Sequence, residues 1–194
     1  RIVRRRGELM ELHGLGGMIA VIGLGDEHLT EIARETGVEV ANFNAPGQTT
    51  LSGRVEALEN ATALAETMTL LVTACLAQPA VFVHRDYMPR NLMVSDPNPG
   101  VLDFQDAVIG PISYDIVCLM RDAFISWDEE RVLDWTVRYW EQARKSALPV
   151  PVDFADFWRE FEWMGLQRHL KVLGIFARLT HRDGKPQYVA DTPR

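Results

Sequence analysis

The chain has 194 residues, of which 47% are hydrophobic and 24% charged, and its formal net charge is −7. This composition is that of a globular protein and excludes a disordered or collagen-like chain. The negative charge argues against general nucleic-acid binding, no apolar run reaches the ~18 residues of a membrane span, and the basic start lacks the apolar segment of a secretory signal.

The first third of the chain is predicted to follow the order β-α-β-β-α. Apolar or alternating runs indicate the strands and Ala- and Leu-rich stretches the helices. Asp26 is expected to be an N-cap, Gly37 the stop of the first helix, and Asn44–Gly47 a turn. The predicted strands are 17–22, 38–43 and 48–52, and the predicted helices are 26–36 and 53–66. One more strand would complete a ferredoxin-like unit, but none is evident.

The rest of the chain is predicted to start with a helix and short strands around a polar loop, and to continue as helices. The strands are expected at 80–83, 91–94 and 101–104. The helices are expected at 68–77, 114–125, 128–147 and 153–180. Asp128 is the expected N-cap of the third of these helices, and Gly165 is a candidate break in the fourth.

Aromatic residues change in frequency near Thr67. Phe43 is the only aromatic residue before it, and all 5 Trp and all 4 Tyr follow it. This difference favours two domains, 1–67 and 68–194, with a junction that runs through or between helices because no Pro- or Gly-rich linker lies there. Since the chain does not begin with Met, we expect a fragment, a processed product or an engineered chain.

Cys75 and Cys118 are the two cysteines, and each lies in an apolar run far from the other. This arrangement is typical of buried free thiols in a reducing compartment. We therefore expect a cytoplasmic protein. The sequence carries no signal of oligomeric state.

One constellation of residues carries a recognisable chemistry. His84, Asp86 and Asn91 fit the pattern H-x-D-x-x-x-x-N, and Asp103 ends a later apolar run. Phosphoryl transfer needs a carboxylate for the proton of the attacking hydroxyl and hard oxygen ligands for Mg²⁺ at the nucleotide phosphates. We assign Asp86 as catalytic base, Asn91 and Asp103 as metal ligands, and His84 as support of the loop. A turn cap or a strand end is the structural alternative for each residue alone, but order and spacing together favour a kinase.

The His-Arg-Asp triplet occurs a second time, at His181–Asp183. The position that should hold Asn is Tyr188, and no strand with an Asp follows. We interpret this copy as a polar cluster at a helix end, without catalysis.

Residues from about 68 to 194 resemble the C-terminal lobe of the aminoglycoside phosphotransferase/choline kinase family, nearest to bacterial anomeric kinases of N-acetylmuramate and N-acetylglucosamine. The segments that carry the resemblance are 83–93, 102–107, 110–115, 127–135 and 163–171. It implies ATP, Mg²⁺ and a small-molecule sugar substrate, and it gives Asp115 the role of supporting the catalytic loop. Acidic residues in such a lobe would also suit a cationic aminoglycoside, so the acceptor stays open.

Kinases of this kind also need an N-terminal lobe, with a phosphate-covering loop and a strand Lys. The first Lys of this chain is Lys145. Arg34 or Arg54 could supply charge, but neither lies in a recognisable strand motif. The glycines of 14–17 and 23–25 do not complete G-x-G-x-x-G, and turn glycines are the alternative. We therefore expect weak or absent turnover.

Residues from about 1 to 66 resemble the small ferredoxin-like subdomain of malonyl-CoA:acyl-carrier-protein transacylase, on the segments 4–10, 17–24 and 40–48. The resemblance implies that Arg6 binds the malonyl carboxylate, for which a bidentate guanidinium is suited. A solvated basic helix end is the alternative. The family's G-H-S-L-G nucleophile motif is absent.

The sequence thus predicts an α+β chimera, in which a partial ferredoxin-like β-α-β-β-α unit precedes a mainly helical, protein-kinase-like C-lobe. The function we expect is ATP- and Mg²⁺-dependent phosphorylation of a sugar hydroxyl. An inactive chimeric or binding scaffold is the main alternative, and malonyl transfer is less favoured because its serine motif is missing. We expect most aromatic residues of the C-terminal helices in the core, with one or two as candidates to stack on a sugar ring.

Overall fold

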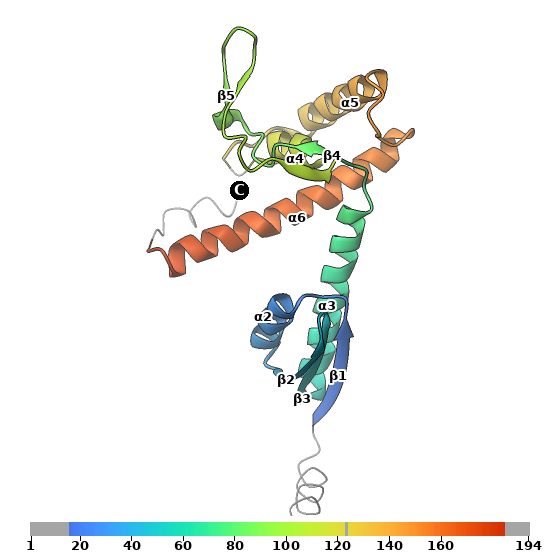
Figure 1. Cartoon of the computed structure of the whole chain (residues 1–194), viewed down its shortest axis with the longest axis vertical. Helices are drawn as coiled ribbons and strands as arrows, with labels where there is room; N and C mark the ends of the chain where they lie inside the picture. Colours follow the sequence, from blue (N-terminus) through green and yellow to red (C-terminus); the bar gives the residue numbers. More distant parts are fainter. Residues whose placement is uncertain (1–15, 123, 185–194) are drawn as a thin grey trace, which may run out of the picture. The chain divides into compact units, whose positions relative to one another are not determined.

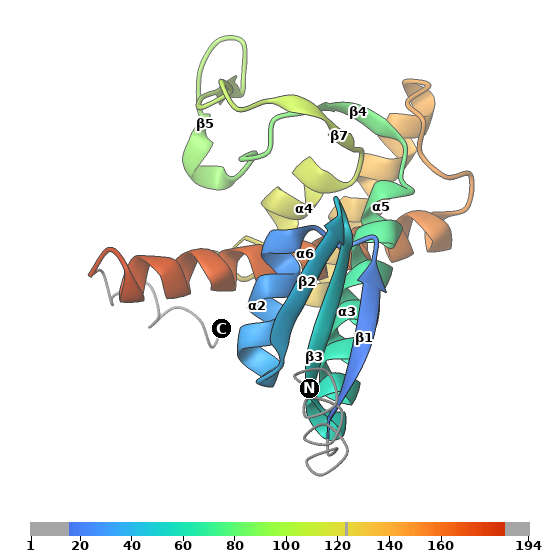
Figure 2. The ribbon, with the colours of Figure 1, turned by 60° about the horizontal axis from the view of Figure 1, so that its bottom comes forward.

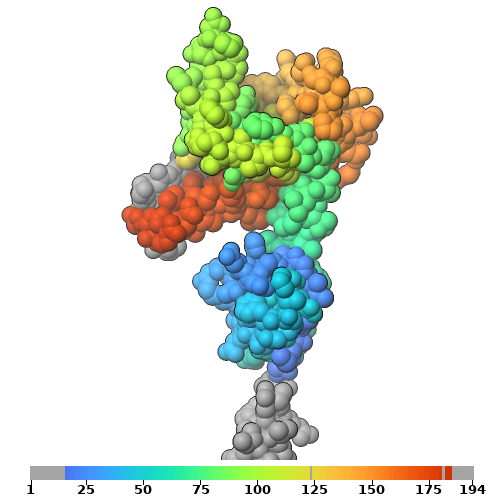
Figure 3. All heavy atoms as spheres, viewed as in Figure 1, coloured from blue at the N-terminus to red at the C-terminus, as the bar shows by residue number. Residues whose placement is uncertain are grey.

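The computed structural model describes residues 16–122 and 124–184. The chain divides into two compact units, residues 1–71 and 72–194, and Figures 1 and 3 follow it by colour. The boundary lies inside α3 (Val55–Leu76), which is one continuous helix. The prediction of two helices, 53–66 and 68–77, is wrong, because no Gly or Pro interrupts the sequence of α3. None of the helices described here is long and apolar enough to cross a membrane.

The first unit contains a three-stranded antiparallel sheet. Along the chain come β1 (Gly16–Ile22), α2 (Asp26–Thr36), β2 (Glu39–Ala45), β3 (Gln48–Arg54) and α3. In the sheet β3 lies between β1 and β2. Ile19 of β1 and Val40 of β2 are therefore both paired with Leu51 of β3.

Both helices of the first unit pack on the same face of this sheet (Figure 2). Leu51 is fully buried among Leu29 and Ile32 of α2 and Leu58 of α3. Because side chains alternate along a strand, Met18 on the opposite face of β1 is 63% exposed. One face of the sheet thus holds the core of this unit.

The ends of α2 follow the sequence signals with one correction. Gly37 has a φ of +74° and forms the expected left-handed C-cap. Gly25, not Asp26, is the N-cap. Asp26 is instead the first helical residue, and its carboxylate accepts a hydrogen bond from the Thr49 hydroxyl at 2.9 Å. The side chain that we expected to cap the helix is therefore bound to β3.

The second unit combines short strands with helices. Its elements are β4 (Ala80–Val83), the 3-10 turn η1 (Pro89–Asn91), β5 (Leu92–Met93), β6 (Gly100–Val101), β7 (Val108–Pro111), α4 (Tyr114–Met120), α5 (Glu129–Lys145) and α6 (Phe154–His181). β4 pairs with β7 and β5 with β6, both antiparallel. The segment between β5 and β6 projects from this unit (Figures 1 and 3).

Side chains from α4, α5 and α6 form the core of the second unit. The largest fully buried side chains are Phe157, Phe161, Met164, Val117 and Val132. The buried Gln78 links the segment before β4 to α4 and α6. Ser113, the N-cap of α4, donates to Gln78 Oε1 at 2.5 Å, and Gln78 Nε2 donates to the Glu160 carbonyl of α6 at 3.0 Å. A buried amide with both ends bonded fixes the position of β4 over α6.

The helices differ from the prediction in length. α4 ends at Met120, not near residue 125, and the indole N–H of Trp127 donates to the Leu119 carbonyl at 3.2 Å. Asp128 caps α5 as expected and accepts from Arg131 N at 2.8 Å. Gly165 does not interrupt α6. A Cβ at this glycine would lie 3.8 Å from Cγ of Arg121, so α6 passes close to the end of α4 here.

The strands around the loop are shorter than predicted, and β7 was not predicted at all. The expected strand at 91–94 is reduced to β5, and the one at 101–104 to β6. Asp103 has a φ of +65°, which is incompatible with an extended strand and ends β6 early. The secondary structure is nevertheless a mixture of α and β, as the sequence predicts.

Candidate functional site

The predicted catalytic loop connects β4 to η1, and α4 holds its start. The backbone N–H of His84 donates to Asp115 Oδ2 at 2.7 Å, and that of Arg85 to Asp115 Oδ1 at 3.0 Å. Asp115 lies in the first turn of α4. One carboxylate therefore binds two consecutive backbone groups of the loop, with charge-assisted hydrogen bonds.

Arg85 has a strained backbone. Its φ is +74°, in the left-handed region that non-glycine residues rarely adopt. The carbonyl of Arg85 accepts a hydrogen bond from the Cys118 thiol at 3.1 Å, and its guanidinium donates to the Asp106 carbonyl at 3.3 Å. Contacts at the N–H, carbonyl and side chain thus hold this conformation directly before Asp86.

His84 links the loop to the segment that precedes Asp103. Its Nε2 donates to the carbonyl of Leu102 at 2.9 Å, and its ring lies edge-on to Tyr87. The side chain is buried, and its Nδ1 has no hydrogen-bond partner within the described residues. The buried His84 side chain thus connects the loop that carries Asp86 to the segment that carries Asp103.

Asn91 and Asp103 lie side by side. Leu102 N donates to the Asn91 carbonyl at 2.9 Å, and this contact brings the two segments together. Asn91 Nδ2 donates to the Asp86 carbonyl at 2.9 Å and lies 3.5 Å from Asp103 Oδ2. Because both contacts use the amide nitrogen, Oδ1 of Asn91 stays available to another ligand.

Gln105 is a site residue that the sequence motif does not include. Its Nε2 donates to Asp103 Oδ1 at 2.6 Å. Gln105 lies in the segment 102–107 that carries the kinase resemblance, but an amide side chain two residues after the candidate metal ligand has by itself no specific meaning. This hydrogen bond leaves Oδ2 as the oxygen of Asp103 that faces Asn91.

Asp86 lies between these supported positions. Its carbonyl accepts from Met88 N at 2.9 Å and from the Asn91 side chain. Its carboxylate accepts no hydrogen bond from the part of the chain that the structure describes, and the residue is half-buried. A carboxylate that is not occupied by protein donors is available to a substrate hydroxyl.

Metal binding would rest on few protein ligands. Among the described residues, no three His, Cys, Asp or Glu side chains gather in a way that could hold a metal. Asn91 and Asp103 offer two oxygen donors, one amide and one carboxylate. Mg²⁺ is commonly bound by one or two such side chains together with substrate phosphates and water, so this pair fits that ion and not a closed structural metal site.

Other residues singled out in the sequence belong to other elements of the chain or are not described. Arg6 lies outside the described residues. In the first unit Arg34 pairs with Glu31 of the same helix, and Arg54 ends β3. At the end of α6, Arg182 donates to the Asp183 side chain, as expected of a polar cluster at a helix end.

Both cysteines are buried free thiols, as expected. Burial raises the pKa of Cys118 to about 12 and also raises that of Cys75. Cys118 therefore remains a neutral thiol that donates to Arg85, and neither residue has the low pKa of a reactive cysteine.

Comparisons with known proteins place these features in a family. The phosphotransferase enzyme family matches residues 22–150. The N-acetylmuramate/N-acetylglucosamine kinase of Pseudomonas putida is 62% identical over 125 residues, which are 64% of this chain and 37% of that protein. The kinase of the same name from Neisseria meningitidis is 62% identical over 129 residues, 66% of this chain and 39% of that protein. The chain thus spans less than half the length of these relatives.

A second similarity is to transacylases. The polyketide biosynthesis malonyl CoA-acyl carrier protein transacylase of Bacillus subtilis is 40% identical over 93 residues, which are 46% of this chain and 32% of that protein. The malonyl CoA-acyl carrier protein transacylase of Salmonella typhimurium is 40% identical over 68 residues, 31% of this chain and 22% of that protein. The similarity to the kinases is greater in both identity and extent.

Proposed function

The chain belongs to the phosphotransferase enzyme family, and we propose that its second unit carries the catalytic loop of an ATP- and Mg²⁺-dependent kinase that phosphorylates a hydroxyl of an N-acetylated amino sugar. The supporting observation is the contact of Asn91 with both Asp86 and Asp103. Identity to N-acetylmuramate/N-acetylglucosamine kinases supports the choice of substrate. A reaction that uses ATP fits a cytoplasmic protein.

Asp86 acts as the catalytic base in this proposal. Its free carboxylate accepts the proton of the attacking sugar hydroxyl and aligns that oxygen with the transferred phosphoryl group. The fixed conformation of Arg85 and the hydrogen bond from Asn91 to the Asp86 carbonyl keep the base in place. Asp115 and His84 are positioning residues, since each acts on the loop and neither is proposed to touch the substrate.

Asn91 and Asp103 hold the metal. Asn91 Oδ1 and Asp103 Oδ2 are the two donors, and the amide of Gln105 orients the Asp103 carboxylate. When bound, Mg²⁺ neutralises negative charge on the nucleotide phosphates. The chain's own part is to keep these oxygens at a fixed distance from Asp86 through the backbone contact of Leu102 with Asn91.

Turnover by this chain is expected to be weak or absent. A kinase of this kind needs a Lys on the nucleotide phosphates, and no Lys precedes the catalytic loop. The glycines of 23–25 lead into α2, whose first turn carries the acidic Asp26 and Glu27. Carboxylates in the first turn of α2 repel a nucleotide phosphate that would bind at this end of the helix. A chain that retains sugar or Mg²⁺ affinity without catalysis is the corresponding alternative.

We further propose that residues 1–67 are a partial ferredoxin-like subdomain of the transacylase type, and that 68–194 are a kinase-like C-lobe. The order β1-α2-β2-β3-α3 and the central place of β3 support the first assignment. Arg6 is the residue of this subdomain that would bind an acyl carboxylate. Malonyl transfer by this chain is disfavoured, because its sequence has no G-H-S-L-G nucleophile motif.

Calorimetry with Mg–ATP tests the nucleotide part, and ³¹P NMR tests the transfer. We expect any sugar phosphate formed from N-acetylmuramate or N-acetylglucosamine to disappear in Asp86→Ala, which removes the base. Glu141→Ala changes an exposed carboxylate of α5 in the same unit and serves as control. Phosphoryl transfer that persists in Asp86→Ala would contradict the assignment of the base. Absence of nucleotide binding at millimolar concentration would favour the inactive alternative.

A further inference from the structure

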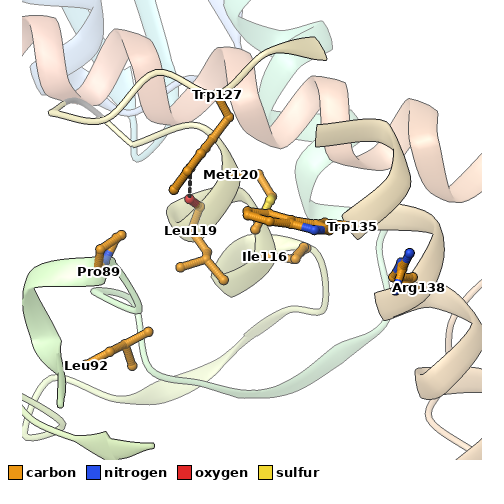
Figure 4. A pocket seen from close by; sticks show the side chains of 8 residues that line it. All are labelled: Pro89, Leu92, Ile116, Leu119, Met120, Trp127, Trp135 and Arg138. Carbon is orange, nitrogen blue, oxygen red and sulfur yellow. Dashed lines mark hydrogen bonds between the residues drawn. The ribbon is translucent and has the colours of Figure 1, made fainter. Parts of the chain in front are cut away.

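A cleft of about 540 Å³ lies in the second unit beside the catalytic loop (Figure 4). Pro89 and Leu92, on either side of the proposed metal ligand Asn91, line one end. Arg138 of α5 lies at the opposite end (Figure 4). The volume falls within the range of small-ligand sites, roughly 300–1,000 Å³. A ligand in this cleft would therefore extend from the catalytic loop towards α5.

The wall of the cleft is apolar and aromatic. The rings of Trp127 and Trp135 are in edge contact, with centroids 5.2 Å apart. Trp127 is fixed by its hydrogen bond to the Leu119 carbonyl, and Ile116 and Met120 of α4 complete the wall. Such a surface suits the apolar face of a sugar ring and the methyl groups of its substituents.

The far end of the cleft carries hydrogen-bond donors. Arg138 uses Nε for an ion pair with Asp134 at 2.9 Å. A guanidinium has five N–H groups, and the Nη groups of Arg138 have no partner among residues 16–122 and 124–184, so they can bind a second carboxylate. The indole nitrogen of Trp135 lies on the Arg138 side of its ring and has no hydrogen-bond partner within the described residues (Figure 4).

The net charge of the protein bears on the role of Arg138. With a formal net charge of −7, the chain repels an anionic small molecule at long range. Binding an acidic ligand therefore requires a local cation. Arg138 is the charged residue among those that line this cleft. The guanidinium of Arg131 lies over the two Trp rings, 5.9 Å from the Trp127 centroid and 5.6 Å from the Trp135 centroid.

We propose that this cleft binds the sugar acceptor, and that Arg138 and the indole N–H of Trp135 recognise a carboxylate on that sugar. This inference rests on the proposed kinase function and specifies its substrate. N-acetylmuramate carries an N-acetyl group and a lactyl ether with a carboxylate, whereas N-acetylglucosamine has the same ring without the carboxylate. The cleft selects the acidic sugar, whose apolar groups contact the two Trp rings.

The two sugars themselves are the probes that test this selection. Each is titrated into the full chain by calorimetry, with Trp fluorescence as a second readout. We expect Arg138→Gln to weaken the binding of N-acetylmuramate about fivefold to tenfold and to leave N-acetylglucosamine unchanged, because only the first loses a charge-assisted contact. Trp135→Phe keeps the aromatic wall and removes the N–H, so we expect a smaller, about threefold, loss for N-acetylmuramate alone.

Arg159→Gln is the matched control. Arg159 is also an exposed helix residue in an ion pair, with Asp156, and its side chain is 67% exposed against 74% for Arg138. We expect the Arg159→Gln variant to bind both sugars with the affinity of the unmodified chain. Circular dichroism melting of each variant separates a lost contact from lost folding.

Three outcomes would overturn the assignment of the cleft: no saturable sugar binding, equal losses for both sugars in Arg138→Gln, or no loss for either.

Failure of the kinase proposal can be distinguished from failure of the cleft assignment. If phosphoryl transfer depends on Asp86 while Arg138→Gln leaves the KM values of both sugars unchanged, the cleft assignment is wrong and the kinase function stands. If N-acetylmuramate binds as expected but no phosphate is transferred in the presence of Mg–ATP, the cleft assignment stands without catalysis.

Discussion

Asp115 Oδ2 lies 2.7 Å from the backbone nitrogen of His84 and accepts its hydrogen bond. The other oxygen of the same carboxylate accepts from Arg85 N at 3.0 Å. The two partners are 30 and 31 residues away in sequence, so only the fold brings them together. Through this contact the first turn of α4 sets the position of the loop that carries Asp86.

Replacement of Asp115 by Ala should destabilise the second unit. It leaves two partly buried backbone N–H groups without their acceptor, and we expect a loss of about 2–4 kcal/mol in the free energy of unfolding. Urea unfolding followed by Trp fluorescence measures this loss, because all 5 Trp lie in the second unit. Glu141→Ala, at an exposed carboxylate of α5, should change this free energy by less than about 0.5 kcal/mol. Equal effects of the two variants would contradict the role given to Asp115.

Gln105→Leu should weaken the binding of Mg²⁺ to the chain. The amide holds one oxygen of Asp103, and loss of a residue that orients a metal ligand typically costs about tenfold in metal affinity. Calorimetric titration of the nucleotide-free chain with Mg²⁺ measures this affinity, so that binding of Mg²⁺ by ATP itself does not contribute. Gln142→Leu, at an exposed position of α5, is the control. An unchanged affinity in Gln105→Leu would show that Asp103 does not need this support.

Asp128→Ala should destabilise α5 by about 1 kcal/mol, because Asp128 caps the helix through Arg131 N. Thermal or urea unfolding gives the difference from the unmodified chain. Glu141→Ala removes an exposed acidic residue from within the same helix and should change the stability little. The N-cap assignment would be wrong if the two substitutions had the same effect.

The two thiols should be unreactive in the folded protein. Both are buried, and the pKa of Cys118 is raised by burial from the ordinary 9.0 to about 12. Ellman's reagent at pH 8 should detect no thiol in the folded chain and both after denaturation. Rapid reaction of either cysteine without denaturation would contradict the buried positions.

The same shift predicts a decrease in stability at high pH. Above pH 9 the Cys118 thiol ionises in the unfolded chain but not in the folded one, so the free energy of unfolding falls as pH rises towards 12. The contribution of Cys118 to the free energy of unfolding falls by about 1 kcal/mol from pH 9 to pH 10. Subtracting the stability of Cys118→Ala at each pH isolates it from other groups. A difference between the two chains that does not change with pH would contradict the assigned pKa.

Replacement by alanine at two glycines should change the free energy of unfolding in opposite directions. A Cβ on Gly53 in β3 would lie 3.0 Å from Val38 Cγ1, so we expect Gly53→Ala to cost about 1–3 kcal/mol. A Cβ on Gly174 in α6 would meet no atom within 4 Å, so Gly174→Ala should stabilise the helix by about 0.5–1 kcal/mol. Hydrogen exchange of β3 and α6 amides reports each change locally. Slower exchange in β3 of Gly53→Ala would contradict the close contact.

Local patterns in the sequence predicted most of the helices and strands and the chemistry of the candidate loop, although they missed β7. A short apolar run predicts β1, apolar alternation predicts β2, and the turn at Asn44–Gly47 predicts the return of the chain as β3. Gly37 predicts the end of α2. These signals act within a few neighbouring residues. The spacing of Asp86 and Asn91 predicts a catalytic loop for the same reason. The catalytic and metal-binding roles themselves stay predictions.

Only the tertiary structure decided which distant groups meet. The indole of Trp127 binds the last turn of α4, so that helix ends at Met120 although the sequence continues with helix-compatible residues. Asp115 meets the backbone N–H groups of His84 and Arg85, which lie 31 and 30 residues away in the sequence. The cleft near Arg138 arises where the catalytic loop, α4 and α5 meet. These contacts depend on side chains and backbone brought together by folding, for which a linear pattern of residues carries no signal.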